Sequence, residues 1–149
     1  MLRPALEADS KTIASIWKAA WASANPSAAR IEPLEHWHAR VQSEFNPPNQ
    51  TFVYEATGGE ILAFMVVNTC DAYLHQLFVH PRAQRTGIGS ELLTHMRAMC
   101  PSGWSLHVAQ SNDNARQFYA RHGLAEGPSS RNPVTSRERV LFSWLPPNI

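Results

Sequence analysis

The chain has 149 residues, with 13 lysines and arginines against 12 aspartates and glutamates, and a formal net charge of +1 at pH 7. A chain of this length buries about 68–70% of its unfolded surface, so we expect one domain over residues 1–149 with its own core. The scattered, nearly balanced charge lacks the positive field that attracts nucleic acid, and no apolar run of about 18 residues predicts a membrane span.

Two cysteines, Cys70 and Cys100, lie far apart in the sequence, without the paired spacing or neighbouring histidines of a zinc site. The first residues include acids and a proline where a secretion signal would need an apolar core. We therefore expect no metal and a reduced, cytoplasmic setting.

In chain order, hydrophobic periodicity and turn residues predict an α/β chain in which hairpins come first and strand–helix–strand units follow. The glycines of Thr57-Gly58-Gly59-Glu60 suit a hairpin turn, and Gly123 suits a helix end. This order predicts a mixed sheet with helices on both faces. The expected elements are strands at 2–5, 51–56, 61–69, 73–79, 104–108 and about 139–144, and helices at about 9–25, 33–45, 87–100 and 112–122.

The segment Gln84-Arg85-Thr86-Gly87-Ile88-Gly89 lies between an apolar strand and an amphipathic helix. Its glycines let the backbone amides of the first helical turn face a phosphate with no Cβ in the way, and a helix N-terminus attracts anions. Arg82 and Arg85 add positive charge nearby. The segment therefore predicts a pyrophosphate site.

Two other kinds of glycine loop fit less well. A P-loop needs Lys and then Ser or Thr after its last glycine, where this chain has Ser90-Glu91. The dinucleotide fingerprint needs a glycine or alanine where Leu92 stands, and an acid near the end of the next strand, where His107 and Gln110 stand. A nucleotide-dependent oxidoreductase is therefore the weaker alternative.

The run Leu77-Phe78-Val79-His80-Pro81, followed by residues 84–89, resembles motif A of the GNAT N-acetyltransferase superfamily, whose pattern is Gln/Arg-x-x-Gly-x-Gly/Ala. Asn112, Ala115, Phe118 and Tyr119 resemble a second block of that family at the expected distance downstream. The resemblance covers nearly the whole chain and implies the GNAT fold. That fold is a mixed, mostly antiparallel sheet of six to seven strands flanked by about four helices.

The resemblance also implies that the chain transfers an acetyl group from acetyl-CoA to a primary amine of a small molecule, amino acid or peptide, by direct attack in a ternary complex. Two parallel strands ending near Val79 and Val108 would splay apart and admit the pantetheine arm. Backbone groups of Leu77 and Val79 would pair with that arm. The residues expected to bind acetyl-CoA are Leu77, Phe78, Val79, Gln84, Arg85, Thr86, Gly87, Ile88, Gly89, Ser90, Asn112, Ala115 and Tyr119.

Three side chains are candidates for proton transfer. An amine with a pKa of about 10.4 is protonated at pH 7, and freeing its lone pair costs about 4–5 kcal/mol, so a base or a desolvated path is needed. Family analogy makes Tyr119 the acid that protonates the CoA thiolate; its alternative role is packing on the sheet. His75 is the first candidate for the base, because a histidine is near-neutral at working pH and its strand leads directly into the cofactor strand. Serotonin-type N-acetyltransferases resemble the chain in carrying a histidine at this place, and the alternative is a half-buried histidine bonded to the backbone. His107 is the second candidate, and direct attack through a water chain is an equally acceptable alternative to a histidine base.

The acceptor groove of the relatives lies under the first two helices, the loop between them and the last hairpin. Here that region supplies Trp21, Glu32 and Trp37 as candidate substrate contacts, with core packing as the alternative for the tryptophans. His122 is expected on the solvated surface. A homodimer stays open, as does a second class of function, a catalytically inactive module that binds or senses acyl-CoA.

Overall fold

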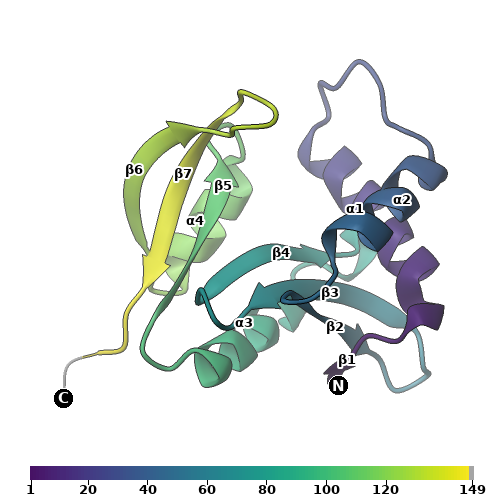
Figure 1. Cartoon of the computed structure of the whole chain (residues 1–149), viewed down its shortest axis with the longest axis horizontal. Coiled ribbons are helices and arrows are strands. Elements are labelled where there is room, and N and C mark those ends of the chain that lie inside the picture. Colours follow the sequence, from purple (N-terminus) through teal and green to yellow (C-terminus); the bar gives the residue numbers. More distant parts are fainter. Residues whose placement is uncertain (148–149) are drawn as a thin grey trace.

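The computed structural model describes residues 1–147, and Figure 1 shows the whole chain. None of the helices within these residues has the length and hydropathy needed to cross a bilayer. The elements are β1 (Leu2–Pro4), the 3-10 turn η1 (Glu7–Asp9), α1 (Ser10–Ala24), α2 (Leu34–Glu44), β2 (Gln50–Glu55), β3 (Ile61–Asn68), β4 (Tyr73–Val79), η2 (Pro81–Ala83), α3 (Ile88–Met99), β5 (Trp104–Ala109), α4 (Asp113–Arg121), β6 (Ala125–Arg131) and β7 (Glu138–Trp144).

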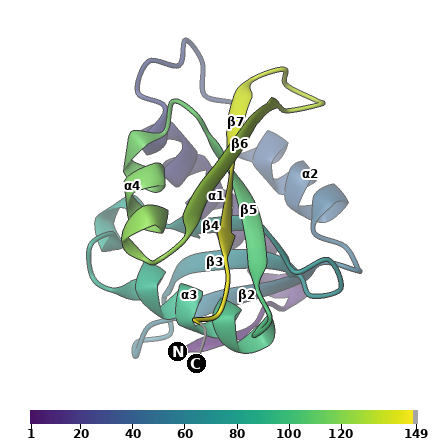
Figure 2. The same ribbon diagram turned by 90° about the vertical axis from the view of Figure 1, so that its left-hand side faces the viewer.

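All seven strands form one sheet in the order β1-β2-β3-β4-β5-β7-β6. Every neighbouring pair is antiparallel except β4 and β5, which are parallel and are joined through α3. Figure 2 shows β5, β6 and β7 running steeply across the direction of β3 and β2, as a twisted sheet requires. The expected mixed, mostly antiparallel sheet with four α-helices is confirmed.

The strands β4 and β5 separate soon after they meet. Their pairing consists of Tyr73 opposite Ser105, next to a hydrogen bond of 3.0 Å from the Ser105 amide to the Ala72 carbonyl oxygen. Beyond this point the two strands diverge (Figure 1). The expected splay is therefore present in the middle of the sheet.

Helices cover both faces of the sheet because the central strand β3 is apolar on both sides. Phe64 and Val66 pack toward α1 and α2, whereas Ala63, Met65 and Val67 pack toward α3 and α4. All five are fully buried. The core on the first face includes Ile13, Ile16, Trp17, Trp37 and Val41, and the core on the second face includes Leu74, Leu92, Leu93, Met96, Val108 and Tyr119.

The sequence prediction missed the strand β6. All seven of its residues, Ala-Glu-Gly-Pro-Ser-Ser-Arg, are exposed, so no apolar alternation marks it. It forms the edge of the sheet, pairs with β7 alone, and breaks register between Glu126 and Ser129. Pro128 lies in that irregular part, where an edge strand tolerates a missing amide donor.

Candidate active site

The helix α3 begins with a turn whose backbone amides are free. Gly87 caps it with a φ of +88°, and the first amide to join the helical bonding is that of Glu91, 3.1 Å from the Gly87 carbonyl oxygen. Within residues 1–147, the amides from Arg85 to Ser90 have no acceptor in the protein. Of the two expected cations, Arg85 is exposed, whereas Arg82 is paired with Glu60. A helix N-terminus of this kind binds anions.

Two side chains of the same loop fold back onto the protein and fix its path. The Thr86 hydroxyl donates to the Ala83 carbonyl oxygen at 2.5 Å. The Gln84 side-chain amide donates to the Val79 carbonyl oxygen at 3.1 Å. These bonds leave the backbone amides of the loop, rather than these two side chains, as its free donors.

A close approach between α3 and α4 needs the second glycine of the motif. A Cβ at Gly89 would lie 3.0 Å from Phe118 Cζ, tighter than nine in ten real Cβ contacts. Ile88 is 7% exposed and packs into the core, so it offers only its backbone amide. Asn112 caps α4 by accepting the Ala115 amide at 3.1 Å. The two sequence blocks therefore meet in space.

The prediction that His122 is a solvated surface residue is wrong. Its Nδ1 bonds the Phe118 carbonyl oxygen at 2.7 Å, and its Nε2 bonds the Ser90 hydroxyl at 2.7 Å. A carbonyl oxygen can only accept, so Nδ1 carries the proton and Nε2 accepts from Ser90. His122 therefore ties the end of α4 to the first turn of α3.

The edge of β4 that faces β5 has free backbone groups. The His80 amide donates to the Leu62 carbonyl oxygen of β3 at 2.8 Å. Because backbone groups alternate in direction along a strand, those of Leu77 and Val79 face the opposite edge, toward β5. The Phe78 side chain packs toward α1 and α2.

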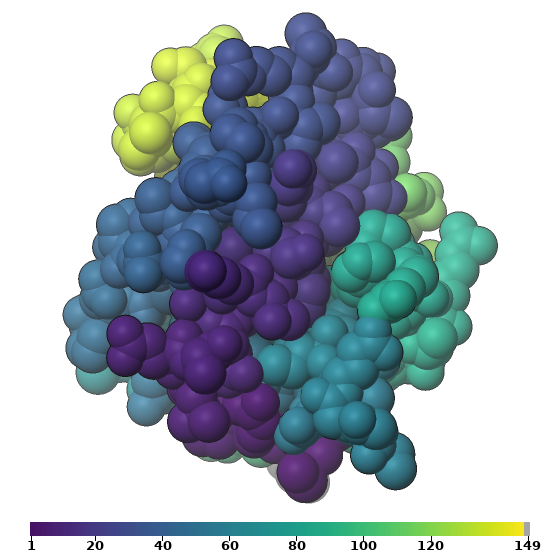
Figure 3. Space-filling view, turned by 90° about the vertical axis from the view of Figure 1, so that its right-hand side faces the viewer, coloured from purple at the N-terminus to yellow at the C-terminus, as the bar shows by residue number. Residues whose placement is uncertain are grey.

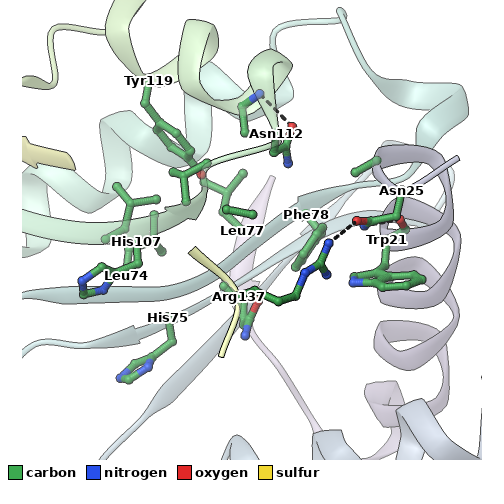
Figure 4. A pocket seen from close by; sticks show the side chains of 16 residues that line it. Trp21, Asn25, Leu74, His75, Leu77, Phe78, His107, Asn112, Tyr119 and Arg137 are labelled. Carbon is green, nitrogen blue, oxygen red and sulfur yellow. Dashed lines mark hydrogen bonds between the residues drawn. The ribbon is translucent and has the colours of Figure 1, made fainter. Parts of the chain in front are cut away.

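A pocket of about 180 Å³ lies where β4 and β5 separate (Figure 4). Its walls come from both faces of the sheet, so it connects the side of α4 with the side of α1. The lining residues are Leu74 to Phe78 of β4, Leu106 to Ala109 of β5, Asn112, Ala115 and Tyr119 from the first side, and Trp21, Ala24, Asn25 and Arg137 from the second.

Tyr119 lies at the α4 end of this pocket. The residue is 6% exposed, its ring packs near Phe118 and Phe142, and Figure 4 shows it directed from α4 toward the gap between the strands. Burial raises the pKa of Tyr119. Among the residues that the structure describes, none bonds its hydroxyl, which is therefore a protonated donor facing the pocket.

A β-bulge presents His75 on the other side. Val66 of β3 pairs with Gln76 and Val67 pairs with Leu74, so His75 between them has no partner across the ladder. Such a bulge redirects a side chain. His75 is exposed, and its ring lies edge-on to the Tyr73 ring, with 4.7 Å between centroids. Partial desolvation lowers the pKa of His75, against a smaller opposing effect of the Asp71 charge.

His107 lies beside this bulge but is already engaged. The Tyr73 hydroxyl is 2.5 Å from His107 Nδ1. Burial raises the pKa of Tyr73, so the phenol keeps its proton and donates to Nδ1. Desolvation, and then the Arg139 charge, lower the pKa of His107. This imidazole is therefore held neutral, with its proton on Nε2.

At the α1 end of the pocket, three polar or aromatic side chains come together (Figure 4). Trp21 and Asn25 come from the last turn and the end of α1, and Arg137 comes from the connection between β6 and β7. The Arg137 guanidinium donates to Asn25 Oδ1 at 3.4 Å. Trp21, one of the predicted substrate contacts, lines this end of the pocket.

The other two expected substrate contacts lie elsewhere. Trp37 is 3% exposed and packs in the core against Trp17 and Trp21, with its indole N–H donating to the Glu32 carbonyl oxygen. The Glu32 carboxylate is paired with Arg30 at 3.5 Å. Neither residue lines the pocket: Trp37 packs in the core, and Glu32 lies in the loop ahead of α2.

Comparison with known families tests the resemblance. The model of the acetyltransferase (GNAT) family matches residues 11–124. The chain belongs to the acetyltransferase (GNAT) family. The matched residues include the loop, the splayed strands and most of the pocket, and the membership makes the chain an acyltransferase. No curated protein shows significant sequence similarity to the chain.

Solved structures share the fold at low sequence identity. The apo form of YjaB from Escherichia coli superposes with a TM-score of 0.80 at 18% identity, covering 99% of this chain and 98% of that one. A GCN5-related N-acetyltransferase from Rhodopseudomonas palustris gives 0.79 at 17%, covering 97% and 94%. The PaiA N-acetyltransferase from Thermoplasma acidophilum, solved with coenzyme A, gives 0.72 at 17%, covering 97% and 98%.

Sequence reasoning missed three residues that the structure brings to the pocket or beside it. Tyr73 belongs to a predicted strand, but its contact with His107 depends on the short register of β4 and β5. The sequence marked Asn25 only as the end of a helix and gave no sign that it contacts Arg137. Arg137 lies in a connection that carries no periodic signal, and its place depends on where the hairpin arm of β6 and β7 folds.

Proposed function

We propose that this chain catalyses the transfer of an acetyl group from acetyl-CoA to a primary amine by direct attack in a ternary complex. The observation that carries the proposal is the pocket where β4 and β5 separate, whose lining includes Tyr119 of α4 and His75 of β4. Such a pocket lets a thioester approach from the side of α4 and an amine approach from the side of α1.

Backbone groups account for most of the proposed acetyl-CoA site. The amides from Arg85 to Ser90 hold the pyrophosphate, because they are free and gathered at a helix N-terminus. The outward backbone groups of Leu77 and Val79 bind the pantetheine arm in the way that a neighbouring strand would. Asn112, Ala115 and Phe118 place α4 against this loop and so complete the wall.

The proposed chemistry joins the amine nitrogen to the acetyl carbonyl carbon and breaks the carbon–sulfur bond. Acetyl-CoA supplies the activated acyl group and the thiolate leaving group. Tyr119 donates its phenolic proton to the leaving sulfur, and the proton lost by the amine returns to the tyrosine through the pocket and solvent. The products are an amide and a free thiol.

His75 is the better candidate for the base. A base must become positively charged, and His107 resists this because desolvation and Arg139 both oppose the imidazolium. Its Nδ1 is also occupied by the Tyr73 hydroxyl. His75 has no such partner, is more exposed, and has the Asp71 charge favouring its protonated form. A water chain ending at His75 would serve the same purpose.

The decisive experiment is a screen of amines for acetyl-CoA-dependent release of free thiol. We expect at least one primary amine to give catalytic turnover. Thermal shifts with acetyl-CoA and with NAD accompany the screen, because a ligand at 100 times its Kd stabilises a protein by about 2.7 kcal/mol. Stabilisation by acetyl-CoA without turnover for any amine would favour the sensing module, and stabilisation by NAD alone would contradict the acetyl-CoA site.

A further inference from the structure

The acceptor end of the pocket carries positive charge without an acidic counterpart. Arg137 is the one Lys, Arg, Asp or Glu side chain that lines the pocket within residues 1–147. The other titratable lining groups on this side, His75 and His107, have lowered pKa values and are neutral at pH 7. The charge that an acceptor meets at this end is therefore that of a guanidinium.

Among the described residues, the Arg137 guanidinium has no strong partner. Its contact is a hydrogen bond of 3.4 Å to a neutral amide oxygen, that of Asn25, and no carboxylate of residues 1–147 lies within 4.0 Å of it. The neighbouring acid Glu138 pairs with Arg131 at 3.6 Å. An arginine fork held by one weak bond keeps most of its donors available for a ligand.

A second cation lies on the same face. Along β7, Val140 packs into the core beside α3 and α4, so Arg139 faces the opposite side, next to His107. Its charge lowers the pKa values of both Tyr73 and His107. Arg139 donates to the Ser130 hydroxyl at 3.3 Å and has no carboxylate partner among the described residues. The acid whose charge acts on His75 is Asp71, which precedes β4 and opposes the lowering of that pKa.

The hairpin that carries Arg137 reaches the rim of the acceptor side. Figure 3 shows the yellow tip of the β6–β7 connection beside the blue segment that precedes α2. The Arg137 bond to Asn25 joins these two regions across 112 residues of sequence. Arg137 therefore lies between the solvent and the pocket, with the Trp21 ring nearby.

We infer that the acceptor is a small amine that carries a carboxylate, and that Arg137 binds this carboxylate while the amine faces His75. The inference rests on the acetyl transfer proposed above and specifies its substrate class. A guanidinium matches the two oxygens of a carboxylate, whereas a polycationic amine would meet like charge at Arg137 and Arg139. Trp21 and Phe78 supply apolar surface for the rest of the acceptor.

The test compares each carboxylate acceptor with its own carboxamide. The probes are L-methionine, L-phenylalanine and β-alanine, their three carboxamides, spermidine, and every amine that the thiol-release screen identifies. In each pair the amine of the carboxamide is less basic than that of the free acid, so amine deprotonation alone would favour the carboxamide. We expect the best acceptor to be a carboxylate, with kcat/KM at least tenfold above that of its carboxamide.

The variant Arg137→Gln separates charge recognition from other effects. A hydrogen-bonded charge pair corresponds to roughly a 10- to 150-fold change in kcat/KM, so we expect a loss of that size for the carboxylate, mostly in KM, and less than twofold for the carboxamide. Arg137→Lys keeps the charge but not the fork, and should lose less. Arg121→Gln replaces an exposed arginine of α4 that does not line the pocket; it is the matched control and should leave kcat/KM unchanged for both substrates.

The outcomes separate this inference from the proposed function. The inference would be overturned, with acetyl transfer intact, if carboxamides or spermidine were the best acceptors. It would also be overturned if Arg137→Gln lowered kcat/KM equally for a carboxylate and its carboxamide. If no amine releases thiol, calorimetry of N-acetyl-L-methionine and its carboxamide with the CoA-loaded protein decides. Binding that is selective for the carboxylate and depends on Arg137 would support the anion site even though acetyl transfer had failed. If no such binding is measured, both the anion site and the proposed acetyl transfer are refuted.

Discussion

The replacement Tyr119→Phe removes one hydroxyl group from the wall of the pocket and leaves the ring in place. The ring lies 5.2 Å from the Phe118 ring and 6.2 Å from the Phe142 ring, and phenylalanine keeps both contacts. Since the hydroxyl has no hydrogen-bond partner in the described chain, its loss should change the free energy of unfolding by less than about 1 kcal/mol. The effect should instead appear in turnover.

The size of that effect follows from the surroundings of the hydroxyl. An ordinary tyrosine is about 1.5 pKa units less acidic than a thiol, and burial raises the pKa of Tyr119 further. A thiolate formed in the same apolar gap is desolvated too, so its pKa rises in parallel and it remains a good acceptor for this proton. A hydrogen bond to a charged group contributes about 1.5–3 kcal/mol, which predicts a roughly 10- to 150-fold loss of kcat.

The assay is steady-state thiol release at saturating acetyl-CoA and amine, with the Kd of acetyl-CoA measured by calorimetry. We expect kcat to fall and the Kd to stay within about threefold of its original value, because the lost group acts after binding. Tyr54→Phe, which removes the same group from a tyrosine outside the pocket, should leave both unchanged. Full turnover in Tyr119→Phe would refute the role of this residue as the acid.

Three further changes test other parts of the structure. In wild type, kcat/KM should fall as the pH drops through the lowered pKa of His75, below about 6.5. The variant His75→Ala should lose this acidic limb of the pH–rate profile. If the acidic limb remains in the variant, another group is the base. Gly89→Ala places a Cβ 3.0 Å from Phe118 and should lower the free energy of unfolding in urea by about 1–3 kcal/mol; no change would show that α4 can shift. Asp9→Asn removes the carboxylate that Arg3 bonds at 2.8 Å and should cost about 1 kcal/mol. The Arg3 bond lowers the pKa of Asp9 in the folded protein. The stability that this carboxylate contributes is therefore fully present above its unfolded pKa of about 3.9 and is lost as the pH falls through the folded pKa. The variant should lack this part of the acid denaturation.

The elements that were predicted well from the sequence are those whose packing requires a regular pattern of apolar residues. The helix α1 repeats apolar residues on the face that meets β3, and β3 itself reads as a continuous apolar run because it is covered on both sides. Strand β6 has no such apolar pattern. It is held by backbone pairing with β7 and buries none of its seven side chains, so its sequence reads as a polar loop.

The loop of the candidate site was predictable because its chemistry is local. Gly87 and Gly89 are adjacent in the chain to the amides that they expose, so spacing alone describes the arrangement. The acceptor side is not local. The direction of His75 depends on a bulge that alternation does not reveal, and Arg137 reaches Asn25 across 112 residues. Contacts that depend on the packing of whole elements leave no signal in residue spacing.

The opening between β4 and β5 is a property of the two half-sheets that flank it. Strand β4 is fixed by six residue pairs with β3, and β5 is fixed by six residue pairs with β7, so each strand is held by its outer neighbour. Neither can turn to close the gap without breaking that ladder. The outward groups of Leu77 and Val79 therefore stay available, and a ligand that pairs with them gains hydrogen bonds without first having to order the chain. The same rigidity keeps Tyr119 and His75 on the walls of one pocket, as the proposed direct transfer between two bound substrates requires.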